Sequence, residues 1–212
     1  MNRPKVNSIA LVKSGYLLEQ LSISRYFWYC CAMSDNAMSG ANQQERLIKR
    51  GWVTGFVDGE GCFSIGLIRN PRIGRQGCKT GYQVFHEFVV TQGAKSVECL
   101  NELHEFFGVG QVLINQCKDN HREHIFRYVV RKRCDLQEVI IPFFQEHSLH
   151  SAKQYDFQKF AQCVTMIDAG HHLTLSGLAD IVQIVETMNR QKPRQELLSI
   201  LRDYTPDASD MR

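Results

Sequence analysis

Residues 52–63 read Trp52-Val53-Thr54-Gly55-Phe56-Val57-Asp58-Gly59-Glu60-Gly61-Cys62-Phe63. Gly51, Gly55 and Gly59 recur at every fourth position, so on a helix they form a stripe without side chains. Each glycine inside a helix costs about 1 kcal/mol relative to alanine. Three such positions in one helix indicate that a second backbone approaches closely, as in helix pairs with small residues at this spacing.

Asp58 and Glu60 stand at the expected C-terminal end of this helix, and Gly61 is suited to a left-handed turn that would end it. Carboxylates at this end lie against the negative pole of the helix dipole. A bound cation would offset the repulsion. The pattern therefore predicts a metal site at the end of a tightly packed helix pair.

The hydrophobic periods downstream predict an α+β fold. Alternation with period two predicts strands, and apolar residues at helical spacing predict helices. The expected elements are a helix at 44–59, strands at 62–68 and 82–92, a helix at 94–107, strands at 111–115 and 125–131, a helix at 134–145 broken by Pro142, a helix at 151–166 and a last long helix capped by Thr174. We expect one four-stranded antiparallel sheet with helices on one face and the other face open.

Residues 53–61 closely resemble the nine-residue signature of the LAGLIDADG homing endonucleases, with Glu60 in place of the final aspartate. The αββαββα order is the one that family uses. Residues 90–92, 107–110 and 148–153 also look like landmarks of the family. The resemblance covers roughly residues 46–190. It implies a single-motif member whose open sheet face is a saddle on the major groove of DNA.

Three segments follow from this interpretation. Residues 1–44 carry no clear period, which predicts an N-terminal extension outside the domain. Residues 45–190 form the predicted LAGLIDADG endonuclease domain. Residues 191–212 are expected to hold a short helix at 197–201 and a frayed tail.

The 212 residues are enough for one domain with its own core. A formal net charge of +3 does not by itself indicate a nucleic-acid partner. The eight cysteines include no C-x-x-C pair, which argues against a zinc site or a disulfide framework and for reduced thiols inside a cell. No run of about 18 uncharged apolar residues occurs, so we expect no membrane partner. The sequence does not distinguish a bacterial cytoplasm from an organelle as the compartment of the protein.

The outward positions of the strands, together with a basic loop, predict the contacts to DNA. The loop after the first strand holds four cations and no acidic residue, which favours phosphate contacts. Arginine suits guanine, asparagine and glutamine suit adenine, and apolar side chains suit thymine methyls. The predicted DNA-binding residues are Ser64, Gly66, Ile68, Asn70, Arg72, Arg75, Lys79, Gln83, Phe85, Glu87, Gln111, Leu113, Asn115, Arg127, Val129 and Arg131.

The catalytic residues are implied by the resemblance. Glu60 matches the family's final acidic position and would bind Mg²⁺ or another divalent cation, which carboxylates hold well. Asp58 is a second catalytic candidate, or it hydrogen-bonds near the helix end and fixes its geometry. Gln92 and Lys153 would order water and meet developing charge. From the residues alone, Gln92 could instead cap the next helix, and Lys153 could be an ordinary surface residue.

Only one copy of the signature is evident. Residues 176–180 echo it faintly but lack the second acid and the terminal glycine. We therefore expect a two-fold homodimer through Gly51, Gly55, Phe56 and Gly59, with one Glu60 from each subunit at the axis. Such a dimer implies a palindromic or nearly palindromic double-stranded DNA target.

The resemblance implies an intron-encoded homing endonuclease that makes a double-strand break in a long, specific DNA site. Two alternatives stay open. One is a maturase that binds intron RNA and assists its splicing. The other is a DNA-binding relative with a decayed active site, against which the presence of Glu60, Asp58 and Gln92 argues mildly.

Overall fold

The computed structural model describes residues 40–70, 80–115 and 124–189. The chain divides into two compact units, Met1–Lys49 and Arg50–Arg212. Helix α2 (Gly40–Glu60) begins in the first unit and ends in the second. It starts four residues before the predicted position, because the polar run that opens it carries no apolar period. The predicted helix at 197–201 lies outside the described residues.

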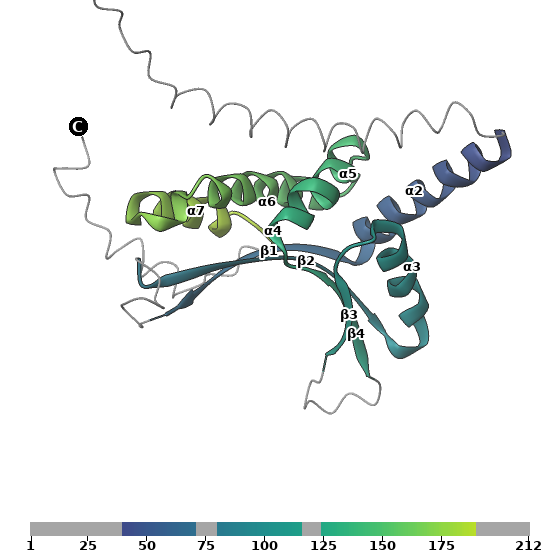
Figure 1. Cartoon of the computed structure of the whole chain (residues 1–212), viewed down its shortest axis with the longest axis horizontal. Helices are drawn as coiled ribbons and strands as arrows, with labels where there is room; N and C mark the ends of the chain where they lie inside the picture. Colours follow the sequence, from purple (N-terminus) through teal and green to yellow (C-terminus); the bar gives the residue numbers. More distant parts are fainter. Residues whose placement is uncertain (1–39, 71–79, 116–123, 190–212) are drawn as a thin grey trace, which may run out of the picture. The chain divides into compact units, whose positions relative to one another are not determined.

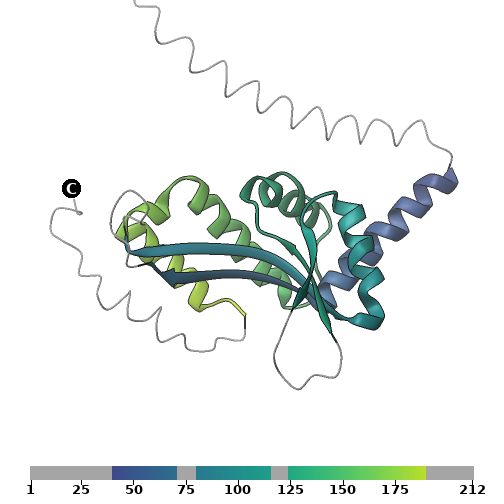
Figure 2. The same cartoon turned by 60° about the horizontal axis from the view of Figure 1, so that its bottom comes forward.

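The second unit is built on one sheet whose strands are β1 (Gly61–Arg69), β2 (Tyr82–Gly93), β3 (Gln111–Asn115) and β4 (Ile125–Val130). The strands pair in the order β1-β2-β4-β3, and every pairing is antiparallel. Figures 1 and 2 show β1 and β2 as a long bent hairpin and β3 and β4 as a shorter one. The predicted four-stranded antiparallel sheet is confirmed.

The helices after the sheet gather on one of its faces. They are α4 (Arg133–Asp135), a π-helical turn (Leu136–Ile140), α5 (Ile141–Glu146), α6 (Lys153–Asp168) and α7 (Leu175–Glu186). In Figure 1 these helices lie above the sheet, and no helix of the described residues covers its underside. Helix α3 (Val97–Phe107) follows a short 3-10 turn, Ala94–Ser96, and packs beside β2, β3 and β4.

Period-two alternation places the large apolar side chains of the strands under these helices. Phe63 is fully buried and is the centre of an aromatic cluster. Its ring centroid lies 5.1 Å from that of Phe88, 5.6 Å from Phe144, 5.2 Å from Phe157 and 5.4 Å from Phe160. Rings at such spacings stabilise a core beyond their buried area. The cluster joins β1 and β2 to α5 and α6, and so fixes the sheet against the helices.

Two local predictions at special residues were wrong. Helical backbone continues through Pro142, because the preceding π-helical turn places this residue in the first turn of α5, where no intrahelical N–H is needed. Gly61 does not adopt a left-handed conformation, and it is the first residue of β1. A Cβ atom there would lie 2.6 Å from Val57 Cγ1 and 2.7 Å from the Val57 carbonyl oxygen. The glycine is therefore required by close packing.

Thr174 caps α7 as predicted. Its Oγ1 accepts a hydrogen bond from the backbone N–H of Gly177 at 3.2 Å, which satisfies one of the unpaired donors at the start of the helix.

Candidate active site at the end of helix α2

Lys153 closes the C-terminal end of α2. A helix leaves its last carbonyl groups without donors from its own backbone. Lys153, the first residue of α6, supplies two of them: its Nζ donates to the carbonyl oxygen of Val57 at 3.0 Å and to that of Gly59 at 3.1 Å. The ammonium thereby lies beside Glu60, the last residue of the helix, and their charges attract.

Burial shifts the ionisation of Lys153. Its pKa is lowered from the ordinary value of 10.5 because desolvation penalises the charged form, while the negative charges of Asp58, Glu60 and Asp156 act in the opposite direction. An ammonium has three donors, and two of them are directed to the helix carbonyls. In the part of the chain that the structure describes, no acceptor takes the third.

Asp58 joins α2 to the start of α6. Its Oδ2 accepts from the backbone N–H groups of His150 and Ser151, both at 3.0 Å, and its Oδ1 accepts from the Ser151 hydroxyl at 2.6 Å. Burial raises the pKa of this carboxyl group, but the Ser151 and His150 hydrogen bonds and the Lys153 charge outweigh it, so the net pKa lies below the ordinary 3.8. These hydrogen bonds support the alternative in which Asp58 fixes the geometry of the helix end, and a catalytic role for Asp58 stays a prediction.

Glu60 differs from Asp58 although only one residue separates them. Its side chain is exposed, and within residues 40–70, 80–115 and 124–189 no group forms a hydrogen bond or an ion pair with it. Its surroundings thus leave the carboxylate oxygens available to a ligand from outside the chain.

Gln92 lies at the same end of the sheet. It is the second-last residue of β2, half-buried, and pairs with Phe126 of β4. Gly61 opens β1 opposite Val90, so the chain passes from Glu60 into the sheet two residues from Gln92. Among the described residues, the hydrogen bonds of Asp58 and Lys153 join the end of α2 to the start of α6, and none of these bonds includes the Gln92 side chain. Its catalytic role stays a prediction.

The glycine stripe, formed by Gly51, Gly55 and Gly59, faces away from the packed side of α2. All three residues are exposed, and a Cβ atom added at any of them would meet nothing within 4 Å. Phe56 is half-buried and stacks on Trp52 with ring centroids 5.3 Å apart. The stripe is thus open, and the dimer interface remains a prediction.

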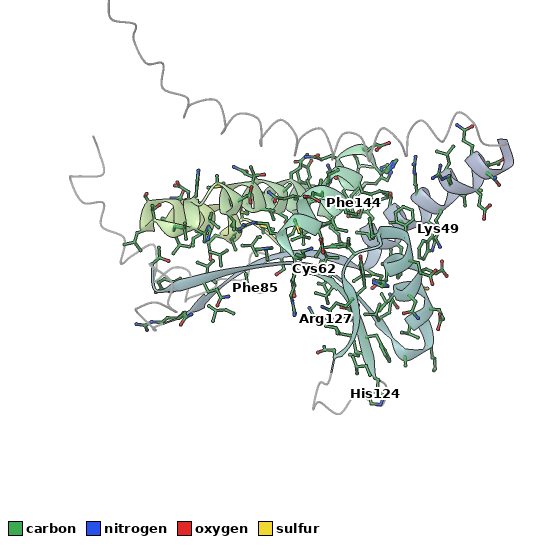
Figure 3. All side chains as sticks on the ribbon, in the orientation of Figure 1. Lys49, Cys62, Phe85, His124, Arg127 and Phe144 are labelled. Carbon is green, nitrogen blue, oxygen red and sulfur yellow. The ribbon has the colours of Figure 1, made fainter. Side chains whose placement is uncertain are left out.

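The strand register places the predicted DNA-binding positions of the strands on the open face of the sheet. Ser64 pairs with Glu87, Gly66 with Phe85, Ile68 with Gln83, Gln111 with Val129 and Leu113 with Arg127. Ile68 and Leu113 expose 56% and 39% of their surface, which leaves apolar groups available on this face. Figure 3 shows Phe144 among the helices and Arg127 on the other side of the sheet. Arg72, Arg75 and Lys79 lie outside the described residues.

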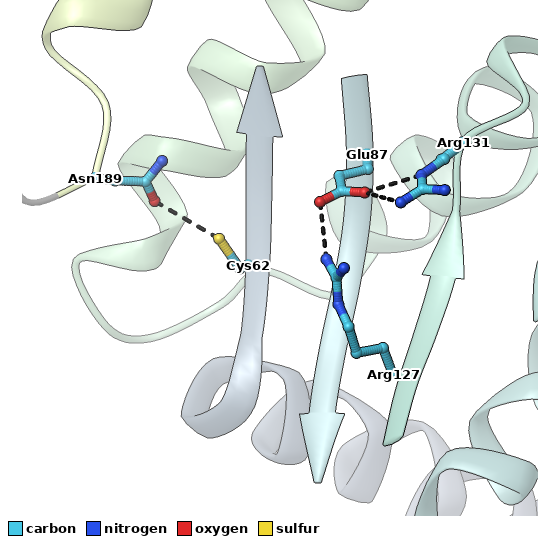
Figure 4. A network of polar contacts seen from close by, with 5 residues as sticks. All are labelled: Cys62, Glu87, Arg127, Arg131 and Asn189. Atoms are coloured by element: carbon cyan, nitrogen blue, oxygen red, sulfur yellow. Dashed lines mark hydrogen bonds and ion pairs between the residues drawn. The ribbon is translucent and has the colours of Figure 1, made fainter. Parts of the chain in front are cut away.

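Three of the predicted DNA-binding positions are less available than alternation suggested. Glu87 and Val129 are buried, with 7% and 4% of their surface exposed. Gly66 lies against the ring of Phe85, which a Cβ atom at this position would overlap. The Glu87 carboxylate binds Arg127 and Arg131, as Figure 4 shows, so it is not an open contact for a base.

The comparisons with known proteins identify the family. The model of the LAGLIDADG endonuclease family matches residues 53–164, more than half of the chain. The chain belongs to the LAGLIDADG endonuclease family. The matched segment runs from the motif in α2 through the sheet into α6, and therefore contains Asp58, Glu60 and Lys153.

Solved LAGLIDADG structures share the fold. The homing endonuclease I-TnaI is 36% identical with a TM-score of 0.61, over 73% of this chain and 96% of that one. The homing endonuclease I-SmaMI bound to cleaved DNA is 30% identical with a TM-score of 0.62, over 73% of this chain and 48% of that one.

Two fungal relatives are similar over part of their length. An uncharacterized 50.9 kDa protein in ND4 intron 1 of Podospora anserina is 34% identical over 125 residues, which are 58% of this chain and 25% of that protein. Probable intron-encoded endonuclease 2 of Neurospora crassa is 28% identical over 137 residues, 65% of this chain and 26% of that protein. The chain thus spans about a quarter of the length of these relatives.

Sequence reasoning missed the partners that hold the site together. Ser151 and His150 bind Asp58 across more than ninety positions of sequence, and Asn189 binds Asp156 and approaches Cys62, with its N–H donating to Asp156 Oδ1 at 2.8 Å. No local pattern marks such pairs. The resemblance marked residues 148–153 as a landmark of the family, but it did not show that His150 and Ser151 bind Asp58.

Over the described ranges, no helix combines the length and the apolar character that a bilayer span requires.

Proposed function

We propose that this chain acts as a homodimer and is a site-specific endonuclease that makes a metal-dependent double-strand break in a long, near-palindromic DNA target. Family membership and the similarity to a probable intron-encoded endonuclease of Neurospora crassa support endonuclease activity, and the similarity to I-SmaMI bound to cleaved DNA supports a DNA substrate. One observation carries the proposal for this chain. The Glu60 carboxylate, unpaired among the described residues, stands beside the Lys153 ammonium at the end of an open helix face.

The residues at this end fit a divalent cation when a second copy contributes. Hard cations such as Mg²⁺ take about six oxygen ligands, of which one or two are protein carboxylates. In the described ranges, no three His, Cys, Asp or Glu side chains come together so that they could hold a metal ion. We therefore assign the cation to Glu60 of both protomers together with DNA phosphates and water. When bound, it would supply an activated water and stabilise charge on the scissile phosphate.

The other residues of the site act through position and charge. Asp58 holds the start of α6 against the end of α2, and so sets the distance between Lys153 and Glu60. The remaining donor of Lys153 is available to an oxygen on which negative charge develops, where a preorganised donor is most effective. Gln92 is proposed to order the attacking water.

The glycine stripe supports the proposal of a homodimer. Its open surface lets a second α2 approach with little side chain between the backbones. A two-fold axis beside the stripe would bring two Glu60 residues together and orient two sheets along one duplex. The near-palindromic target is the consequence. We further propose that the reading frame lies within an intron and that the joined exons form the target.

Cleavage assays test this function. The full chain is incubated with plasmid DNA that carries the joined exons, with and without Mg²⁺, and is compared with Glu60→Gln. We expect Mg²⁺-dependent linear product from the wild type, and a loss of at least about a thousandfold in rate with retained binding for the variant. Wild-type chain that binds the duplex without cutting it, or Glu60→Gln chain that still cuts, would contradict the proposal.

A further inference from the structure

We propose that Glu87 determines the sequence specificity of the open face by fixing the guanidinium groups of Arg127 and Arg131 for base contacts. The inference rests on the DNA-cleaving function proposed above. It assigns Glu87 as a positioning residue that acts through the two arginines rather than by touching DNA itself.

The path of Arg127 shows how firmly it is held. Arg127 pairs with Thr91 on the neighbouring strand, and its Nη2 lies 2.9 Å from Glu87 Oε1, four residues away along β2. To reach that oxygen, the aliphatic part of Arg127 crosses the Val89–Val129 pair between them. Both valines are on the open face, yet only 6% and 4% of their surface is exposed. The arginine thus lies along the sheet instead of projecting from it.

Glu87 binds the second arginine through its other oxygen. Arg131 Nε and Nη2 lie 3.0 Å and 2.9 Å from Glu87 Oε2. Figure 4 shows the carboxylate between the two guanidinium groups. With only 7% of Glu87 exposed, its carboxylate is shielded from water, and charge-assisted hydrogen bonds to such a group are strong and directional. Each guanidinium is therefore fixed in place before any DNA arrives.

A carboxylate in the middle of this face is unfavourable for attraction to phosphate. Phosphate binding depends chiefly on net positive charge and is largely independent of sequence. Glu87 reduces the net charge of the cluster from +2 to +1, so it weakens that attraction. Base recognition instead needs donors held in fixed positions, because guanine presents two acceptors at a set spacing. The benefit of Glu87 is therefore orientation, which serves specificity.

Donors remain for that recognition. Arg127 binds Glu87 through Nη2 alone, and no other acceptor in the described ranges takes its Nε or Nη1. Its side chain is 26% exposed and that of Arg131 is 56% exposed, so both can be reached by a ligand on the open face.

The test compares the wild type with Glu87→Gln, which keeps the shape but removes the charge. Glu105→Gln is the matched control, because it removes the same charge from an exposed position on α3. The specific probe is the duplex that the wild type enriches from a pool of randomised DNA, and the non-specific probe is an unselected duplex. Binding of both is measured over a range of salt concentrations, and a thermal melt confirms folding.

We expect Glu87→Gln to bind the unselected duplex more tightly and to lose about tenfold or more of its preference for the selected one, the range of one good arginine–guanine contact. Arg127→Gln should lose preference at the same base pair, and Glu105→Gln should behave as the wild type. A purely structural defect would instead weaken both probes equally. That result, or an unchanged preference in Glu87→Gln, overturns the inference.

Two further outcomes are decisive. If Glu87→Gln does not fold, Arg127→Lys replaces it: lysine keeps the charge without the fork, so it should lose preference at one base pair while binding the unselected duplex normally. An unchanged preference in Arg127→Lys overturns this inference and leaves the proposed function standing. A wild type that enriches no sequence at all removes the proposed function, and this inference with it.

Discussion

The two sides of helix α2 differ in how many of their groups are buried or hydrogen-bonded by the rest of the described chain. On one side Val53 and Val57 are fully buried and Asp58 is bound by the loop before α6. On the other side the glycine stripe is open, and Glu60 has no partner among the described residues. The buried and hydrogen-bonded groups of the first side stabilise the fold. The open surface and the exposed carboxylate of the second side are suited to a second subunit, a cation and DNA, so the function of this side depends on groups from outside the chain.

Alanine substitutions at Gly61 and Gly59 should show the largest difference in the free energy of unfolding. The two residues are close in sequence, but only Gly61 is packed against its own chain. Gly61→Ala places a methyl group against the Val57 carbonyl, so we expect the free energy of unfolding to fall by about 1–3 kcal/mol at every protein concentration. Gly59→Ala meets nothing within its own chain. Urea unfolding of dilute protein should show it about 0.5–1 kcal/mol more stable than the wild type.

The concentration dependence sharpens that prediction. At concentrations where the wild type is a dimer, Gly59→Ala should become the less stable of the two, because its methyl group lies between the paired helices. Equal effects of the two substitutions at all concentrations would remove the distinction between the sides of α2.

Asp58→Asn gives a smaller effect that depends on pH. Because the pKa of Asp58 in the folded chain is lowered from 3.8, its ionised form stabilises the fold above that pH, and the contribution is lost as pH falls through the lowered pKa. We expect wild type to exceed the variant by about 1 kcal/mol in free energy of unfolding at neutral pH. Urea unfolding between about pH 7 and about pH 3 should show this difference shrink. A difference that grows in acid would contradict the assignment.

Local sequence patterns were sufficient to predict the sheet and the motif. They were not sufficient to predict the side-chain contacts between elements. Alternation put Ser64 and Ile68 on the outward face of β1, and the opposite face, which carries Phe63 and Ile65, packs under the helices. It also put Glu87 on the open face, but it could not show that Arg127 of β4 and Arg131, the residue after the end of β4, would bind its carboxylate. Such pairs depend on strand register, which only the folded chain defines.

Lys153 and Gly61 show the same limit. Resemblance indicated Lys153 as part of the site, yet its hydrogen bonds to the end of α2 span more than ninety positions of sequence. Gly61 was recognised as special for the wrong reason, because a glycine forced by close packing and one forced by a left-handed turn look the same in sequence.

Analytical ultracentrifugation of the wild type and Gly55→Leu, paired with the plasmid cleavage assay, tests most directly that two copies of α2 form the active site. A leucine side chain at this position starts in open space within its own chain, so the variant should fold normally. We predict that the wild type sediments as two chains and linearises the plasmid, and that Gly55→Leu sediments as one chain and does not. A wild type that cuts both strands while it sediments as a single chain would contradict the account.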